Sequence, residues 1–107
     1  MKEIKAIIRP SRLNKVRDAF RSLPGFPGMT ISNVEGCSAH SGMEQDGSLK
    51  AELTDFTKKL RIEIVAPEEM LPAILQIIRH NAHTGQIGDG VLWVTEVSEF
   101  MRLSQAK

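Results

Sequence analysis

The sequence predicts an α+β fold of the ferredoxin-like kind, a duplicated β-α-β sandwich whose four-stranded antiparallel sheet carries two helices on one face. The first observation is a strand-proline-helix pattern that occurs twice, and aligning Pro10 with Pro67 places Phe20 opposite Ile77. The second is that each copy is followed by another apolar, strand-like run. Two such units in 107 residues account for one domain of ordinary size, so we expect residues 1–107 to form a single domain.

The first unit begins with a short strand at residues 5–10, which ends at a proline. A helix follows, with Ser11 as its expected N-cap and Pro24-Gly25 as its stop signal. Its inward-facing positions recur at helical spacing and are Leu13, Val16, Phe20 and Leu23. Residues 29–34 then read as the second strand of the unit.

The second unit repeats this design with a strand at residues 61–67, a helix and a strand at 91–97. Strand alternation turns Leu60, Ile62 and Ile64 toward the helices, and their neighbours Arg61, Glu63 and Val65 away from them. The helix buries Met70, Ile74, Ile77 and Ile78, and the last strand adds Leu92, Val94 and Val97, or their neighbours, to the covered face. Residues 100–103 are expected to form one more short strand or a docking segment.

The opposite face of the sheet is half apolar and half charged. It carries Lys5, Ile7, Arg9, Glu63 and Trp93. Such a face is neither good core nor ordinary solvent surface, so we expect another subunit to cover part of it.

Composition excludes several classes of protein. A formal net charge of +1 gives no concentrated basic face, so nucleic acid is not an expected partner. No apolar run approaches the roughly 20 residues that a membrane span requires, and the N-terminus does not resemble a signal peptide. A single cysteine, Cys37, gives no internal disulfide. These features predict a cytoplasmic protein without direct membrane insertion.

Two segments remain as candidates for function. Residues 37–55 are rich in glycine, serine and polar side chains, and a loop of this length in a compact domain favours a flexible recognition loop over a plain connector. Residues 84–90 place three glycines and an acid between a helix and a strand. The simpler interpretation of this glycine loop is a helix end followed by a tight turn. The functional one is a concave set of backbone N–H groups that accepts an anion.

Four blocks of this chain resemble the PII signal-transduction family, in a divergent PII-like form. They are residues 1–10, 28–30, 61–65 and 84–90, and the resemblance extends over residues 1–103. It implies a homotrimer of ferredoxin-like domains that binds adenine nucleotides in the clefts between subunits. It also implies a role in nitrogen regulation, in which the long loop controls a membrane transporter or a metabolic enzyme.

The resemblance implies a nucleotide site assembled from several segments. Glycine-loop residues would face phosphate through backbone N–H groups, and two basic residues would contact it through charge. The loop root at residues 36–39 would contribute backbone groups. The implied residues are Ile7, Thr30, Gly36, Ser38, Ala39, Lys59, Glu63, Val65, Gly88, Asp89, Gly90 and Arg102.

Several positions depart from the family pattern. Basic residues are replaced by Gln86, Val91 and Ser104, and the loop root carries Ala39 and His40. Each lost cation forgoes on the order of 1.5–3 kcal/mol of charge-assisted hydrogen bonding at most, which disfavours tight ATP binding and favours ADP, AMP or no nucleotide. The family's modified loop tyrosine is absent, with Glu52 in its place.

Two alternatives stay open beside this regulatory, non-catalytic interpretation. A metal-responsive PII-like protein associated with heavy-metal efflux would use His80 and His83. Cys37 and His40 would complete the ligand set only if the long loop folded over or came from another subunit. Histidines at a helix end are more often caps, so no metal site is predicted. An enzyme would need Asp89 or Glu63 as a base, yet the sequence offers no acid-base pair. Neither the effector, 2-oxoglutarate included, nor the target is identified by sequence.

Overall fold

The computed structural model describes residues 1–37 and 56–107. Four strands and two helices follow one another as two β-α-β units, as predicted for the ferredoxin-like α+β class. Short 3₁₀ turns precede each helix at Pro10–Arg12 and Glu68–Met70, and another lies near the C-terminus at Leu103–Gln105. The strands are β1 (Lys2–Ile8), β2 (Thr30–Gly36), β3 (Thr57–Ala66) and β4 (Gly90–Glu96), and the helices are α1 (Leu13–Arg21) and α4 (Leu71–Ala82).

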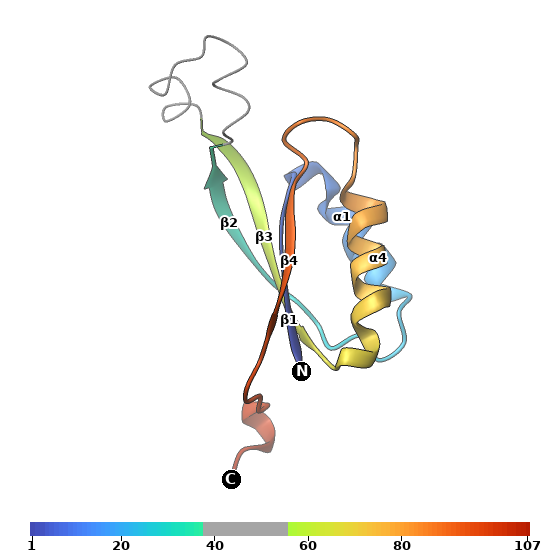
Figure 1. The fold of residues 1–107 in the computed structure, drawn as a ribbon, viewed down its shortest axis with the longest axis vertical. Helices are drawn as coiled ribbons and strands as arrows, with labels where there is room; N and C mark the ends of the chain where they lie inside the picture. The colour runs from blue at the N-terminus through green and yellow to red at the C-terminus, as the bar shows by residue number, and fades with distance from the viewer. Residues whose placement is uncertain (38–55) are drawn as a thin grey trace.

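The four strands form one antiparallel sheet in the order β2-β3-β1-β4. Both helices lie on the same side of it (Figure 1). The central strand β1 pairs Lys5 with Glu63 of β3 and with Trp93 of β4, so these three side chains share one row on the uncovered face. Strands β2 and β4 are the edges of the sheet within the described chain.

The core lies between the sheet and the helices and contains no buried polar or charged residue among those described. Phe20 of α1 stacks on Phe26, with ring centroids 4.3 Å apart. The predicted inward positions of both helices and of β3 are confirmed. The buried residues are Ile4, Ala6, Ile8, Val16, Phe20, Leu60, Ile62, Ile64, Ala66, Ile74, Ile78 and Ala82, and Leu13, Leu23, Met70, Ile77, Leu92 and Val94 pack against them.

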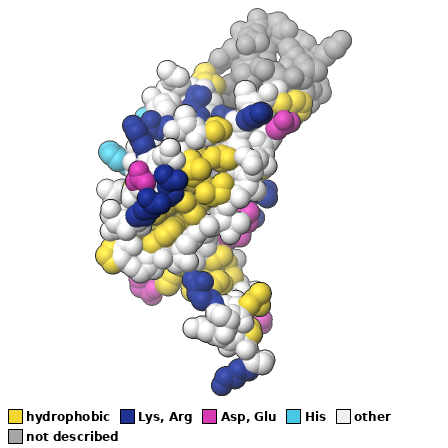
Figure 2. Space-filling model, turned by 180° about the vertical axis from the view of Figure 1, so that it is seen from behind, with side chains coloured by type: hydrophobic (Ala, Val, Ile, Leu, Met, Phe, Trp, Pro, Cys, Tyr) yellow, Lys and Arg dark blue, Asp and Glu magenta, His cyan; other side chains and the backbone are white. Residues whose placement is uncertain are grey.

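The face of the sheet away from the helices, called the open face below, is mixed as predicted. Val91 and Trp93 of the edge strand β4 are 60% and 40% exposed. Ion pairs run along the strands beside them, with Lys5 Nζ 3.6 Å from Glu3 Oε1 and Arg61 Nε 3.3 Å from Glu63 Oε1. On the side of the molecule shown in Figure 2, hydrophobic side chains form a band bordered by basic and acidic groups.

Two local predictions were wrong, and a third was wrong in one of its two alternatives. Ser11 is not an N-cap, because the chain first makes a 3₁₀ turn and α1 begins at Leu13 without a side-chain cap. The first strand begins at Lys2, three residues earlier than expected, because it pairs with both neighbours along its whole length. Residues 100–103 form no strand, because the chain leaves the sheet after Glu96 and makes a 3₁₀ turn at Leu103–Gln105. The alternative of a docking segment stays a prediction.

Two further sequence predictions concern the long loop and the absence of membrane spans. The recognition loop predicted at 37–55 lies outside the described residues except for Cys37, which is half-buried. In the described part of the chain, neither helix has the length and apolar character needed to cross a membrane.

Candidate glycine-loop site

The glycine loop joins α4 to β4 at one end of the sheet. His83 ends the helix with extended backbone, at φ −77° and ψ 129°. Gly85, Gly88 and Gly90 then adopt positive φ values of 86°, 101° and 113°. These values explain why glycine recurs here, because side-chain-bearing residues rarely adopt them. The predicted helix end and tight turn are therefore confirmed.

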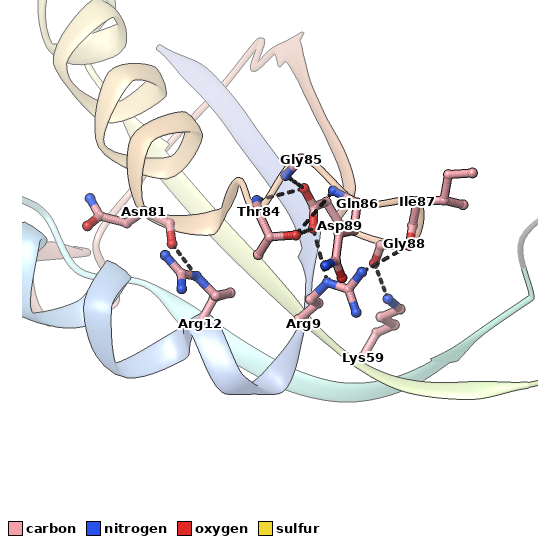
Figure 3. A network of polar contacts seen from close by, with 10 residues as sticks. All are labelled: Arg9, Arg12, Lys59, Asn81, Thr84, Gly85, Gln86, Ile87, Gly88 and Asp89. Atoms are coloured by element: carbon pink, nitrogen blue, oxygen red, sulfur yellow. Dashed lines mark hydrogen bonds and ion pairs between the residues drawn. The ribbon is translucent and has the colours of Figure 1, made fainter.

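Asp89 is the centre of the loop's hydrogen bonds (Figure 3). Its Oδ2 accepts from the backbone N–H of Thr84 at 2.7 Å and of Gly85 at 2.9 Å. Its Oδ1 accepts from the Thr84 hydroxyl and from Nε of Arg9, the latter at 3.0 Å. The carboxylate thus binds the start of its own loop and the end of β1.

Two cations also hold backbone carbonyls of this loop. Arg9 Nη2 donates to the carbonyl oxygen of Ile87 at 2.9 Å, and Lys59 Nζ donates to that of Gly88. A methyl group built on Gly88 would lie 3.2 Å from Arg9 Nη2 and 3.8 Å from Lys59 Nζ. The two positive groups therefore converge over a glycine with no side chain to separate them (Figure 3).

These contacts shift the pKa values of two side chains. The pKa of Asp89 lies well below its usual range, because the Thr84 hydroxyl and N–H, then Arg9 and Gly85, donate to the ionised form. The pKa of Lys59 is lowered, first by burial and then by the positive charge of Arg9, while Asp89 acts in the other direction. Burial and the nearby Arg9 charge thus both disfavour the charged form of Lys59.

The end of the loop fits closely against β1. A methyl group built on Gly90 would lie 1.7 Å from the carbonyl oxygen of Ile7. Gly90 pairs with Ile8 at the start of the β1–β4 ladder, so the loop cannot move away without opening the sheet edge. Glycine at this position is a steric requirement of the fold.

A cavity of about 420 Å³ lies toward the other end of the sheet, beside the start of β2. Arg102 reaches it from the C-terminal segment, where its Nη2 donates to the carbonyl oxygen of Pro27 at 3.3 Å and its guanidinium lies 5.6 Å from the centre of the Phe100 ring. The cavity combines apolar and polar walls. It is lined by Glu3, Pro27, Gly28, Met29, Thr30, Glu63, Val65, Phe100 and Arg102.

Comparisons with known proteins agree over the full length of the chain. The family model described as nitrogen regulatory protein P-II matches residues 1–107. The chain belongs to the nitrogen regulatory protein P-II family. It is 34% identical to nitrogen regulatory protein P-II of Rhizobium meliloti (strain 1021) and of Azospirillum brasilense, over 96% of this chain and 91% of each relative. It is 36% identical, with the same coverage, to nitrogen regulatory protein P-II 1 of Escherichia coli (strain K12). The resemblance found in the sequence is thus confirmed, and P-II proteins are regulatory signal transducers.

The residues implied by the P-II resemblance fall into two groups within one subunit. The glycine-loop group contains Ile7, Gly36, Lys59, Gly88, Asp89 and Gly90, with Gly36 placed there because a methyl group built on it would lie 3.4 Å from Lys59 Cγ. The cavity group contains Thr30, Glu63, Val65 and Arg102. Lys59 and Glu63 are four residues apart on β3, roughly 13 Å along the strand. Ser38 and Ala39 lie outside the described residues.

Sequence reasoning missed two residues that hydrogen-bond to Asp89 of the P-II glycine loop. Arg9 was assigned only to the open face, and Thr84 was not selected, yet both bind Asp89. Arg9 is 80 positions from Asp89, so no local pattern joins them. Thr84 had a weak signal, because a threonine and an aspartate bracket the glycines at a spacing that permits a closed turn.

The metal-responsive alternative finds no support among the described residues, and His40, one of its proposed ligands, lies outside them. His80 lies in the last turn of α4 and His83 directly follows the helix, as expected for residues near its C-terminus. Within residues 1–37 and 56–107, no group of three or more histidine, cysteine, aspartate or glutamate side chains is placed to hold a metal ion. The three relatives compared have names that refer to nitrogen regulation.

Proposed function

We propose that this P-II protein is a homotrimeric, non-catalytic regulator that binds an adenine nucleotide between subunits and controls a target protein. Its membership of the P-II family supports the regulatory role. Nucleotide binding, trimer formation and control of a target are the parts that we propose. The target is a membrane transporter or a metabolic enzyme, and residues 37–55 contact it. The cytoplasmic location predicted from sequence stays a prediction.

The observation that carries the proposal is the division of the implied site into two incomplete halves. The glycine-loop group offers the cation Lys59 and a glycine backbone with N–H groups, which suit phosphate. The cavity group offers Thr30, Glu63 and Val65, which suit the polar edge and flat faces of a nucleoside, together with the cation Arg102. One subunit keeps these halves apart along β3. Packing the glycine loop of one subunit against the cavity of the next would complete a nucleotide site.

The open face supports the association of subunits. Val91 and Trp93 expose apolar area on this face at the edge strand β4. Lys5 and Glu63 lie opposite each other in the row that contains Trp93. A second copy of the chain would bury the apolar side chains, while Lys5 and Glu63 would neutralise each other within one subunit. In a three-fold arrangement each subunit would contribute one edge and one face.

The supply of cations favours the less charged adenine nucleotides. Among the described residues, Lys59 and Arg9 are the cations that donate to backbone carbonyls of the glycine loop. Val91 supplies no further charge at the start of β4. Each phosphate oxygen without a cationic partner loses about 1.5–3 kcal/mol of charge-assisted hydrogen bonding. We therefore expect ADP or AMP to compete well with ATP.

The state of the carboxylates supports a non-catalytic role. Asp89 has four hydrogen-bond donors around it and a pKa below its usual range, which makes it a weak base. Oε1 of Glu63 lies 3.3 Å from Nε of Arg61 in an ion pair. Asp89 therefore lacks the environment that raises a carboxyl pKa for acid-base catalysis, and the Glu63 carboxylate is held in its ion pair.

The test is a substitution at the glycine between the two cations. Gly88→Val adds a β-branched side chain at φ 101°, with its first carbon 3.2 Å from Arg9 Nη2. We expect ADP affinity, measured by isothermal titration, to fall at least about 100-fold, since both the backbone and the two cations must move. Sedimentation velocity should show the same oligomer as the unmodified protein. Unchanged ADP binding by the variant would refute the proposed phosphate loop.

A further inference from the structure

An acid within a phosphate-binding loop poses an electrostatic problem. Asp89 lies next to Gly88, over which Arg9 and Lys59 converge. A free carboxylate at this distance would repel a phosphate and would also weaken the attraction of both cations for it. The loop can therefore bind phosphate well only if the negative charge of Asp89 is paired with donors of the protein itself.

The hydrogen bonds of Asp89 supply that means. Thr84 and Gly85 donate to the carboxylate from the beginning of the loop, and Arg9 donates to it from the end of β1. The Asp89 and Arg9 side chains are only 20% and 28% exposed, so water screens their pairing less than it would on an open surface. Both carboxylate oxygens are thus engaged, and the side chain faces its own loop rather than a ligand.

We propose that Arg9 and Thr84 are positioning residues of the phosphate-facing loop, which clamp Asp89 from two sides and so neutralise its carboxylate and fix Gly88. This inference rests on the nucleotide site proposed above and adds the residues that prepare it. Neither side chain needs to touch the nucleotide. Their effect on binding passes through the order of the loop and the charge left on Asp89.

The geometry explains why arginine and threonine occupy these positions. The guanidinium of Arg9 uses Nε for Asp89 and Nη2 for the Ile87 carbonyl, so one planar group bridges both ends of the turn around Gly88. A lysine has a single ammonium and lacks this fork. The Thr84 hydroxyl donates to Asp89 and also accepts from the Gln86 N–H at 3.3 Å, which a methyl group cannot do.

The test compares Thr84→Val with Thr84→Ser, and Arg9→Lys with Arg21→Lys. Thr84→Ser keeps the hydroxyl, and Arg21→Lys makes the same exchange at an exposed residue of α1. We expect Thr84→Val and Arg9→Lys each to weaken ADP binding roughly 10-fold in isothermal titration, the effect of one lost charge-assisted hydrogen bond. Thr84→Ser and Arg21→Lys should stay within about 2-fold of the unmodified protein. Equal losses in Thr84→Ser and Thr84→Val, or unchanged binding in Arg9→Lys, would overturn the clamp.

A second readout separates the clamp from the nucleotide proposal. Amide hydrogen exchange of residues 84–90 is measured without ligand, so it reports loop order whether or not a nucleotide binds. The clamp predicts faster exchange at Gly85 in Thr84→Val than in Thr84→Ser. If the unmodified protein binds no adenine nucleotide, the proposed function fails while this difference still supports the clamp. Equal exchange in the two variants would refute the clamp alone.

Discussion

Replacing Gly90 by alanine puts a methyl group where the carbonyl oxygen of Ile7 already lies. The added carbon would be 1.7 Å from that oxygen and 2.8 Å from the carbonyl carbon, and both neighbours are backbone atoms of the central strand β1. Backbone in the middle of a sheet has no rotamer by which to withdraw. The variant must therefore open the first pairs of the β1–β4 ladder or shift β4 along its length.

The expected loss of stability has two parts. The positive φ of 113° at Gly90 costs a side-chain-bearing residue about 1–2 kcal/mol. Opening the ladder near Ile8 adds the loss of about two backbone hydrogen bonds, roughly 1–3 kcal/mol together. The sum of about 2–5 kcal/mol is a large fraction of the 5–15 kcal/mol that typically holds a domain folded.

Gly28→Ala provides the matched control. Gly28 has a nearly equal φ of 105°, but a methyl group there meets nothing within 4 Å, so only the backbone term of about 1–2 kcal/mol applies. Both variants are compared with the unmodified protein by equilibrium urea unfolding at one protein concentration, because subunit association shifts apparent stability. Equal losses in the two variants would refute the close contact between the glycine loop and β1.

Two further predictions concern charge and association. For Asp89→Asn, the pKa of the carboxyl is depressed in the folded state, so its stabilisation is complete above about pH 5 and is lost as pH falls below about 4. The stability gap between the unmodified protein and this variant should therefore narrow in acid, and a gap that stays constant in urea unfolding down to about pH 3 would contradict this assignment. For Trp93→Glu, the new carboxylate faces Lys5 on the open face, so the subunit should still fold while the proposed trimer dissociates. Sedimentation velocity decides this, and a trimer of unchanged stability would exclude Trp93 from the subunit interface.

The fold was predictable because its signals are local and repeated. Val16 and Phe20 recur at helical spacing, and Ile62 and Ile64 alternate with polar neighbours, so the pattern alone identifies the buried face. The bounds were less predictable. The prediction that Ser11 caps α1 was wrong because Ser11 lies within a 3₁₀ turn between β1 and the helix.

The candidate site was predictable only where the motif lies in one segment. The glycine loop was found from its residues, and its positive φ values agree with that reading. The contact of Arg9 with Asp89 joins residues 80 positions apart and depends on the β1–β4 pairing, which composition and spacing do not specify. The role of the Asp89 side chain followed only from its donors, because an aspartate beside glycines is equally compatible with facing a ligand.

The most direct test of the proposed function is isothermal titration of the metal-free protein with ADP, AMP and ATP, each with and without Mg²⁺, combined with sedimentation velocity. The account predicts a trimer that binds one adenine nucleotide per subunit, with ADP or AMP bound at least as tightly as ATP. A monomer, or a trimer with no saturable binding of any of the three nucleotides, would contradict it.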